Sequence, residues 1–145
     1  MFNIEITQEE FYNENDIKCI YGKITLGEFH EKFSMSLSFW KKDEYLRQWK
    51  KSLSEAIREG QSCLITSMVE PIKDNYIFCW PIYNEGDYLI FQNRILFLSD
   101  LSEEFKLENL NDYVGERTQY DEDGEKISEW KLKKEEVNTF LQSLS

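Results

Sequence analysis

The chain has 145 residues, of which 28 are acidic and 17 basic, so its formal net charge is −11. This balance argues against nucleic acid and against an anionic membrane surface as partners, because both are bound through Lys and Arg. The acidic balance fits a basic protein partner, because opposite charges speed association, or it serves solubility alone. With 41% hydrophobic and 15% aromatic residues, the chain should fold as one domain over residues 1–145.

Three cysteines, Cys19, Cys63 and Cys79, each lie within an apolar run and have no CxxC spacing. We expect buried, reduced thiols and therefore a reducing compartment. The N-terminus lacks a basic stretch followed by an apolar one, so we expect no secretory signal peptide. Together these features predict a cytoplasmic protein.

Residues 1–16 carry five acids and no base. Thr7 and Glu10 have the spacing of a helix capping box, and Ile6 with Phe11 could form the accompanying hydrophobic staple. The pattern predicts a short helical turn, with a frayed acidic terminus as the alternative.

Residues 17–27 and 29–40 predict two strands joined by a tight turn at Gly27-Glu28. The second strand alternates strictly, which is typical of one buried and one solvated face. Its apolar face would carry Phe33, Met35, Leu37 and Phe39, and its polar face Lys32, Ser34, Ser36 and Ser38. Gly22, inside the first strand, indicates a bulge or a close backbone approach.

Residues 43–59 predict a helix that Asp43 can cap and that Gly60 can end in a left-handed conformation. Its apolar stripe consists of Tyr45, Leu46, Trp49, Leu53, Ala56 and Ile57. Its polar side holds the basic residues Lys41, Lys42, Arg47, Lys50, Lys51 and Arg58. Acids offset these charges, so a solvated helix face is expected.

Three further strands are expected at 61–70, 75–83 and 88–98, with a hairpin turn at residues 84–87. Pro81 cannot donate a ladder hydrogen bond, which predicts an edge position or a bulge. A loop and a short helix through Leu107, Leu110, Tyr113 and Val114 occupy 99–116. An acidic turn at 119–125, a short strand near 126–131 and a helix near 133–143 follow. The sum is an α+β fold, an antiparallel β-sheet with flanking helices.

The chemistry of a catalytic, cofactor or metal site is not indicated. His30, the only histidine, falls on the polar side of a strand without a nucleophile motif, so we expect a surface residue. Asp121, Asp123 and Gly124 match part of a calcium loop, but Gln119 and Trp130 stand where its end ligands belong. We therefore predict no enzyme activity, no cofactor, no metal and no small-molecule ligand.

Four stretches resemble one family when they are taken together. They are 37–53 (LSFW, then Tyr45, Trp49 and KSL), 67–80 (SMVEP, then Lys73, Asn75, IF and Trp80), 92–98 (QNRILFL) and 117–130 (RT, Asp121, DG and KISEW). In this order they are similar to the CdiI immunity proteins of bacterial contact-dependent growth inhibition, most closely to the subgroup paired with toxins that cleave 16S ribosomal RNA. The resemblance spans about residues 34–145.

The resemblance implies a cytosolic protein that binds and neutralises the C-terminal toxin domain of a cognate CdiA protein. It also implies a Whirly-like fold, although nucleic-acid binding does not transfer with a fold. A ribonuclease presents a basic surface to RNA, and an acidic protein can occupy that surface. Our candidate partner contacts are Asp121, Glu122, Asp123 and Glu125, together with Tyr83, Asp87 and Tyr88, with an ordinary solvated turn as the alternative for each. Trp40, Trp49, Trp80 and Trp130 are expected in the core.

Two other functions stay open. A Whirly-like single-stranded nucleic-acid-binding protein would need a basic groove with aromatic side chains, and only the face around Lys41, Lys42, Lys50 and Lys51 could serve. A small enzyme of unrecognised type would depend on His30.

Overall fold

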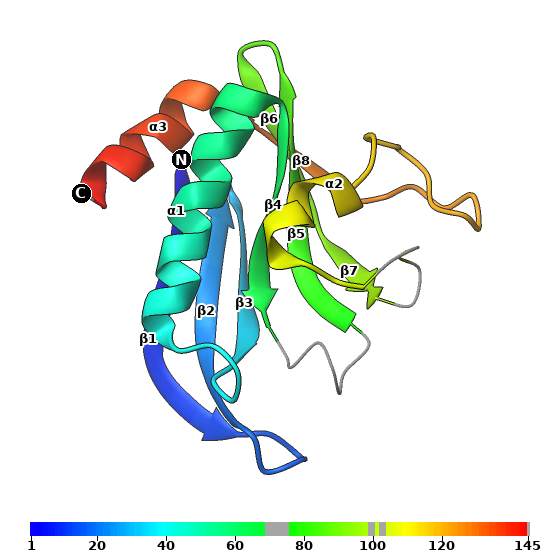
Figure 1. The fold of residues 1–145 in the computed structure, drawn as a ribbon. Coiled ribbons are helices and arrows are strands. Elements are labelled where there is room, and N and C mark those ends of the chain that lie inside the picture. The colour runs from blue at the N-terminus through cyan, green and yellow to red at the C-terminus, as the bar shows by residue number, and fades with distance from the viewer. Residues whose placement is uncertain (69–75, 99–100, 102–103, 145) are drawn as a thin grey trace.

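The computed structural model describes residues 1–68, 76–98, 101 and 104–144, and shows two antiparallel sheets with helices packed against them (Figure 1). The first sheet has the order β1-β2-β3 and consists of Phe2–Tyr12, Lys18–Leu26 and Phe29–Ser36. The second has the order β4-β5-β6-β8, with β7 also paired to β5; its strands are Gln61–Ser67, Tyr76–Glu85, Tyr88–Gln92, Arg94–Phe97 and Glu129–Lys133. The helices are α1 (Lys42–Glu59), a 3₁₀ turn at Leu107–Asn109 that leads into α2 (Leu110–Tyr113), and α3 (Lys134–Ser143). The predicted α+β class is confirmed.

The N-terminal segment is a strand, so the predicted helical turn is wrong. β1 pairs antiparallel with β2, with Phe2 opposite Leu26 and Ile4 opposite Ile24. Phe11 stacks on Tyr21 with ring centroids 4.3 Å apart instead of forming a staple. The ladder supplies a partner for every second backbone group, and burial of Phe2 and Ile4 adds to it, so tertiary pairing outweighs the local capping pattern.

Gly22 confirms the expected close approach. A Cβ atom at this position would lie 2.4 Å from Cε2 of Phe33, its cross-strand neighbour on β3. On its other side the register of β1 and β2 shifts between Ile6 and Glu10, next to the Ile6–Gly22 pair. β3 ends at Ser36, four residues earlier than predicted, and Phe39 is consequently 43% exposed instead of buried.

β5 is the central strand of the second sheet, and Pro81 lies within it. On one side it pairs with Cys63 of β4. On the other side the ladder stops after the Ile82–Phe91 pair and resumes at Cys79–Arg94 in the same register. The predicted strand 88–98 is therefore divided into β6 and β7 at the point that faces a residue without an N–H.

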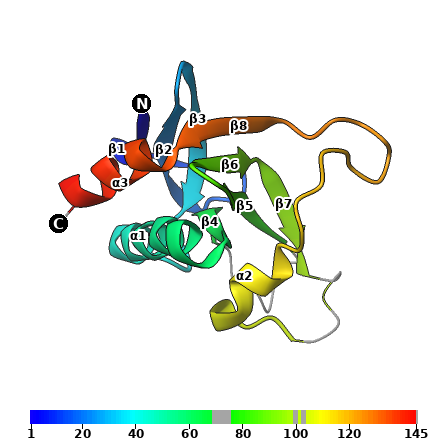
Figure 2. The same ribbon diagram turned by 90° about the horizontal axis from the view of Figure 1, so that it is seen from above.

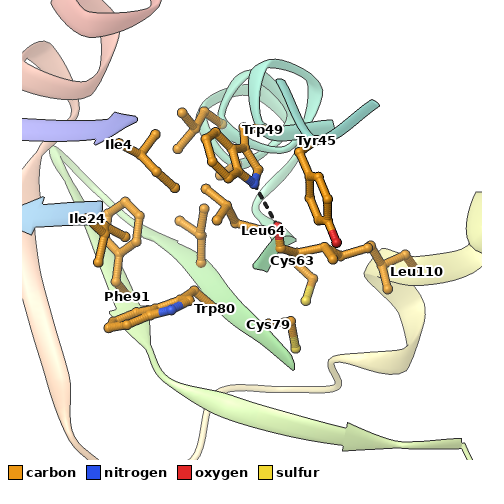
Figure 3. Packing of buried hydrophobic residues seen from close by; sticks show 14 of the residues in the cluster. Ile4, Ile24, Tyr45, Trp49, Cys63, Leu64, Cys79, Trp80, Phe91 and Leu110 are labelled. Atoms are coloured by element: carbon orange, nitrogen blue, oxygen red, sulfur yellow. Dashed lines mark hydrogen bonds between the residues drawn. The ribbon is translucent and has the colours of Figure 1, made fainter. Parts of the chain in front are cut away.

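Helix α1 covers the free edge of β4 with polar side chains. The amide of Gln48 donates to Cys63 O at 2.7 Å and accepts from Ile65 N at 2.9 Å, as a neighbouring strand would. Trp49 Nε1 donates to Ile65 O at 2.6 Å (Figure 3), and Tyr45 Oη accepts from Met68 N at 2.9 Å. The edge is thereby closed to other strands. The helix begins one residue before Asp43, and Glu44 accepts from the Lys41 N–H, so the predicted cap residue is wrong.

One continuous core joins the two sheets and the helices. Trp40, Trp49 and Trp80 are buried, and Trp130 is half-buried between Phe29 and Trp80, so the expected core tryptophans are confirmed. All three cysteines are buried and free, as predicted (Figure 3 shows Cys63 and Cys79). Burial raises the pKa of the Cys63 thiol well above its usual value, which keeps it protonated and inert. From α1 and α3 the apolar stripes face this core, except for exposed Leu46 and Leu144.

Candidate interaction surfaces

The predicted acidic turn is a hairpin, which we call the acidic hairpin (residues 119–127). Tyr120 bridges to Lys126, and Ile127 N donates to Gln119 O at 2.9 Å. The carboxylate of Asp121 accepts from the backbone N–H groups of Asp123 and Glu125, both at 2.9 Å. Asp121 therefore holds the turn together, in the manner of an Asx turn.

The acidic hairpin projects away from the body of the molecule (Figures 1 and 2, orange). Asp121, Glu122, Asp123 and Glu125 are all exposed. Tyr120, at 58% exposed, adds a large apolar surface beside them. An exposed loop that combines four carboxylates with an aromatic ring is suited to a basic partner.

The base of the acidic hairpin is fixed by an ion pair that sequence reasoning missed. Arg117 donates from Nε to Glu129 Oε2 at 2.8 Å, and from Nη2 to Oε1 at 2.7 Å. The buried side chain of Gln92 donates to Thr118 O at 2.9 Å and to the same carboxylate at 2.6 Å. Hydrogen bonding from Arg117 lowers the pKa of Glu129. Residues 117 and 129 lie 12 apart in an acidic stretch, and no spacing rule marks them as a pair.

The other predicted contact residues are not joined to the acidic hairpin. Asp87 is exposed in the turn between β5 and β6, and Tyr88 is half-buried with Lys131 Nζ 4.2 Å from its ring centroid. In the β6–β8 ladder, Tyr88 pairs with Lys133 at one end, whereas the acidic hairpin leaves from the Gln92–Glu129 pair at the other. Four residues of strand separate them, which is about 14 Å. Tyr83 is only 4% exposed and is not presented on this surface, and burial raises its pKa.

A second exposed surface, which was not predicted, lies on β5 and β7. We call it the apolar patch (Tyr76, Phe78, Ile95 and Phe97). Their exposed fractions are 37%, 40%, 42% and 46%. Residues 76–80 and 94–97 are apolar at nearly every position, and such a run indicates a strand covered on both faces. The exposure of the four patch residues could not be predicted from these runs, because the sequence does not show how far along β5 and β7 other elements cover the sheet.

The alternative sites find less support. Lys41, Lys42, Lys50 and Lys51 are exposed on or beside α1, but Lys41 Nζ donates to Leu37 O at 3.2 Å and Lys42 Nζ lies 3.6 Å from Glu10. A groove of about 270 Å³ between α1 and residues 107–111 is lined by acids as well as bases, including Glu44, Arg47, Lys51 and Glu55. No continuous basic channel for a nucleic-acid backbone is formed by these side chains.

His30 is exposed on β3, opposite Thr25, which confirms a surface residue. Within the described part of the chain, no three His, Cys, Asp or Glu side chains are grouped so that they could hold a metal ion. None of the helices in the described ranges is long and apolar enough to span a bilayer.

Comparison with known proteins points to one family. The family model of the CdiI N-terminal domain matches residues 35–140. The immunity protein CdiI of Enterobacter cloacae subsp. cloacae is 37% identical over 125 residues, which cover 86% of each chain. A solved chain of the CdiA-CT/CdiI toxin and immunity complex from Enterobacter cloacae superposes with a TM-score of 0.89 at 35% identity, covering 99% of this chain and 98% of that one. The superposition includes β1 and β2, which lie outside the stretch, about residues 34–145, over which the sequence resembled the family.

Proposed function

The chain belongs to the CdiI N-terminal domain family, and we propose that it is the immunity protein of a toxin–immunity pair, which binds and neutralises the C-terminal toxin domain of a cognate CdiA protein. The observation that carries this proposal is the superposition on the chain from the CdiA-CT/CdiI complex over nearly the whole length of both chains. Function does not follow from fold alone. Here the sequence identity of 37% adds to the likeness of fold.

The cognate toxin in this proposal is a nuclease that cleaves 16S ribosomal RNA. Such an enzyme needs a cationic surface for its substrate. The acidic hairpin offers four exposed carboxylates on a rigid base, and the chain as a whole carries a charge of −11. Opposite charge would accelerate the encounter, and the bound immunity protein would exclude RNA from the surface that it covers.

The proposed mode of action is binding alone, by a single domain acting in the cytosol. It involves no chemistry on the toxin, no cofactor and no nucleic acid. The competing function, a Whirly-like single-stranded nucleic-acid binder, would depend on the lysines on and beside α1, and two of these, Lys41 and Lys42, are engaged within the chain. A filter-binding assay at low salt separates the two, since tight and salt-sensitive binding of an oligonucleotide would favour the competing function.

The experiment that tests the proposal is co-expression. The C-terminal domain of the large protein encoded beside this gene is expressed with and without this chain, and growth and 16S rRNA integrity are followed. We expect the toxin domain alone to stop growth, and this chain to restore growth and to purify with it as a stable complex. An unrelated immunity protein serves as the control. A toxic domain that this chain neither binds nor neutralises would refute the proposal, whereas rescue with intact rRNA in both arms would refute only the rRNA target.

A further inference from the structure

Building on the proposed function, we propose that the apolar patch is the water-excluding centre of the toxin-binding surface, and that the acidic hairpin is the charged rim beside it. The patch would set how long the complex lasts, and the hairpin how fast it forms. The occupant is the basic toxin domain, which must then carry a matching apolar pocket or ridge within its cationic surface.

The patch is a compact group made by strand pairing. Tyr76 faces Phe97 and Phe78 faces Ile95 across the β5–β7 ladder, so all four side chains stand on one side of the sheet. The rings of Tyr76 and Phe78 meet edge to face with centroids 5.3 Å apart. Ile77 and Leu96, which alternate with them, are buried on the opposite side. The strands thus present aromatic side chains in fixed positions, at little entropic cost on binding.

The exposure has a structural cause. Phe78 and Tyr76 continue the face on which Trp80 lies, because alternate residues of a strand share a face. Trp80 is covered by Trp130, which stacks on Phe29 of the first sheet at 4.5 Å. The cover from Trp130 does not extend to Phe78 and Tyr76, the next two residues on this face of β5. Within the described ranges, the patch is therefore the uncovered continuation of the core surface between the sheets.

Its size fits the centre of an interface and not a whole one. Side chains of this kind expose about 300 Å² together at these fractions. A standard interface covers about 800 Å² per partner, with an apolar centre inside a polar rim. Both views place β7 on the side of the molecule to which the acidic hairpin projects, so the hairpin is positioned to supply part of that rim (Figures 1 and 2).

Charge selects the kind of partner. A second copy of this chain would bring another −11 charge and another acidic hairpin to the same place, and the patch alone is too small to overcome that repulsion. Stacking of nucleic-acid bases needs cations beside the rings. β5 and β7 contain one, Arg94, and it donates to Val114 O at 3.1 Å on the opposite side of the sheet. A basic protein satisfies both constraints.

The test measures binding kinetics of the full-length chain with the purified toxin domain. The variant Phe78→Ala/Phe97→Ala removes two exposed rings of the patch. The control Phe39→Ala/Leu46→Ala removes two side chains of similar exposure, 43% and 41%, from other parts of the surface. We expect the patch variant to dissociate at least about 100-fold faster with little change in association rate, and the control to match the wild type. Thermal unfolding shows whether each variant is folded.

Phe97→Lys, a single change at the end of β7, is the second variant if the double variant fails to fold, and it should lose binding by a similar factor. Wild-type dissociation rates in these variants would overturn the inference while leaving the proposed function intact. So would a wild-type dimer that Phe78→Ala/Phe97→Ala dissociates, or binding of a single-stranded oligonucleotide that the same variant abolishes. A wild-type chain that does not bind the toxin domain refutes the proposed function itself.

Discussion

Arg117 and Glu129 face each other as a two-pronged pair, with both N···O distances below 3 Å and Gln92 donating to the same carboxylate. The side chains are 26% and 16% exposed, so water screens the pair only partly. Charge-assisted pairs of this geometry are among the stronger hydrogen-bonded contacts in proteins. Because the pair closes the base of the acidic hairpin, it helps to position the exposed carboxylates of the hairpin, although neither Arg117 nor Glu129 belongs to the hairpin.

Replacing Arg117 with Met should lower the free energy of unfolding by about 1–3 kcal/mol, because Glu129 loses its main partner. The folded-state pKa of Glu129 is below its usual 4.5, so the pair stabilises the protein fully above that pH and progressively less as pH falls through the folded pKa. Urea unfolding at pH 7 and pH 3 checks this. The stability difference between the wild type and Arg117→Met should be smaller at pH 3 than at pH 7, and a constant difference would contradict the assignment.

The burial of Tyr45 predicts that the free energy of unfolding decreases at alkaline pH. Burial raises its pKa from 10.0 to about 12, and Oη donates to Ser36 O at 2.6 Å. The folded state holds this proton more tightly than the unfolded chain, so its contribution is complete below pH 10 and is lost as pH rises toward 12. The difference corresponds to about 3 kcal/mol. Tyr45→Phe should be less stable at pH 7 and should lack this part of the alkaline decline, as measured by urea unfolding between pH 7 and 11.

Gln48 should matter for association as well as for stability. Gln48→Met keeps the volume but leaves Cys63 O and Ile65 N without their side-chain partner, at a cost of about 2 kcal/mol. The freed edge of β4 should also promote aggregation at high concentration. Arg47→Met, at the exposed neighbouring position, is the control and should change neither property. Unfolding and light scattering measure the two effects, and equal behaviour of the variants would contradict the edge-covering role.

Gly22→Ala should destabilise the first sheet by about 1–3 kcal/mol, because the added methyl group overlaps the ring of Phe33. That ring packs edge to face on Trp49, with centroids 6.1 Å apart, and cannot move freely. Gly22→Ala/Phe33→Leu should regain part of the loss by removing the overlapping atoms. A double variant as unstable as the sum of the two single changes would locate the cost elsewhere. Thermal and urea unfolding provide the comparison.

Neutralising the tip of the acidic hairpin should slow association with the toxin domain. The variant Glu122→Gln/Asp123→Asn/Glu125→Gln keeps Asp121, whose carboxylate holds the turn. We expect an association rate about 10-fold lower at low salt, converging with the wild type at high salt, and an unchanged dissociation rate. Glu5→Gln/Glu14→Gln/Glu28→Gln makes the same change of net charge elsewhere and should have a smaller effect. Equal effects would mean that only the total charge matters.

Most elements could be predicted from the sequence because their signals were local. The alternation in residues 29–36, the apolar stripe of α1 and the Gly-containing turns each depend on neighbouring residues. The strand at Phe2–Tyr12 could not be predicted in this way, because it is stabilised by its pairing with β2 and its local sequence fits a helical turn equally well. The same holds for Phe39, which alternation placed inside although β3 ends at Ser36.

The surface was predicted only in part for a similar reason. The acidic hairpin is a contiguous run of acids, and its exposure follows from composition. Predicting the apolar patch would require the pairing register of β5 and β7. It would also require the knowledge that the cover over Trp80, made by Trp130 and Phe29, ends there. Tyr83 was expected near the hairpins but is turned inward, because the inward side of a strand depends on what packs against it.

The acidic hairpin contributes no buried side chain between Gln119 and Lys126, and its attachment depends on Arg117, Glu129 and Gln92 below it. Its tip can therefore change sequence, length or charge without disturbing the core. If the hairpin contacts the toxin as proposed, selection on a new toxin would act there while other residues hold stability constant. Under the proposed function, such a separation would let the protein diverge with its partner in small steps, each of which leaves a folded molecule.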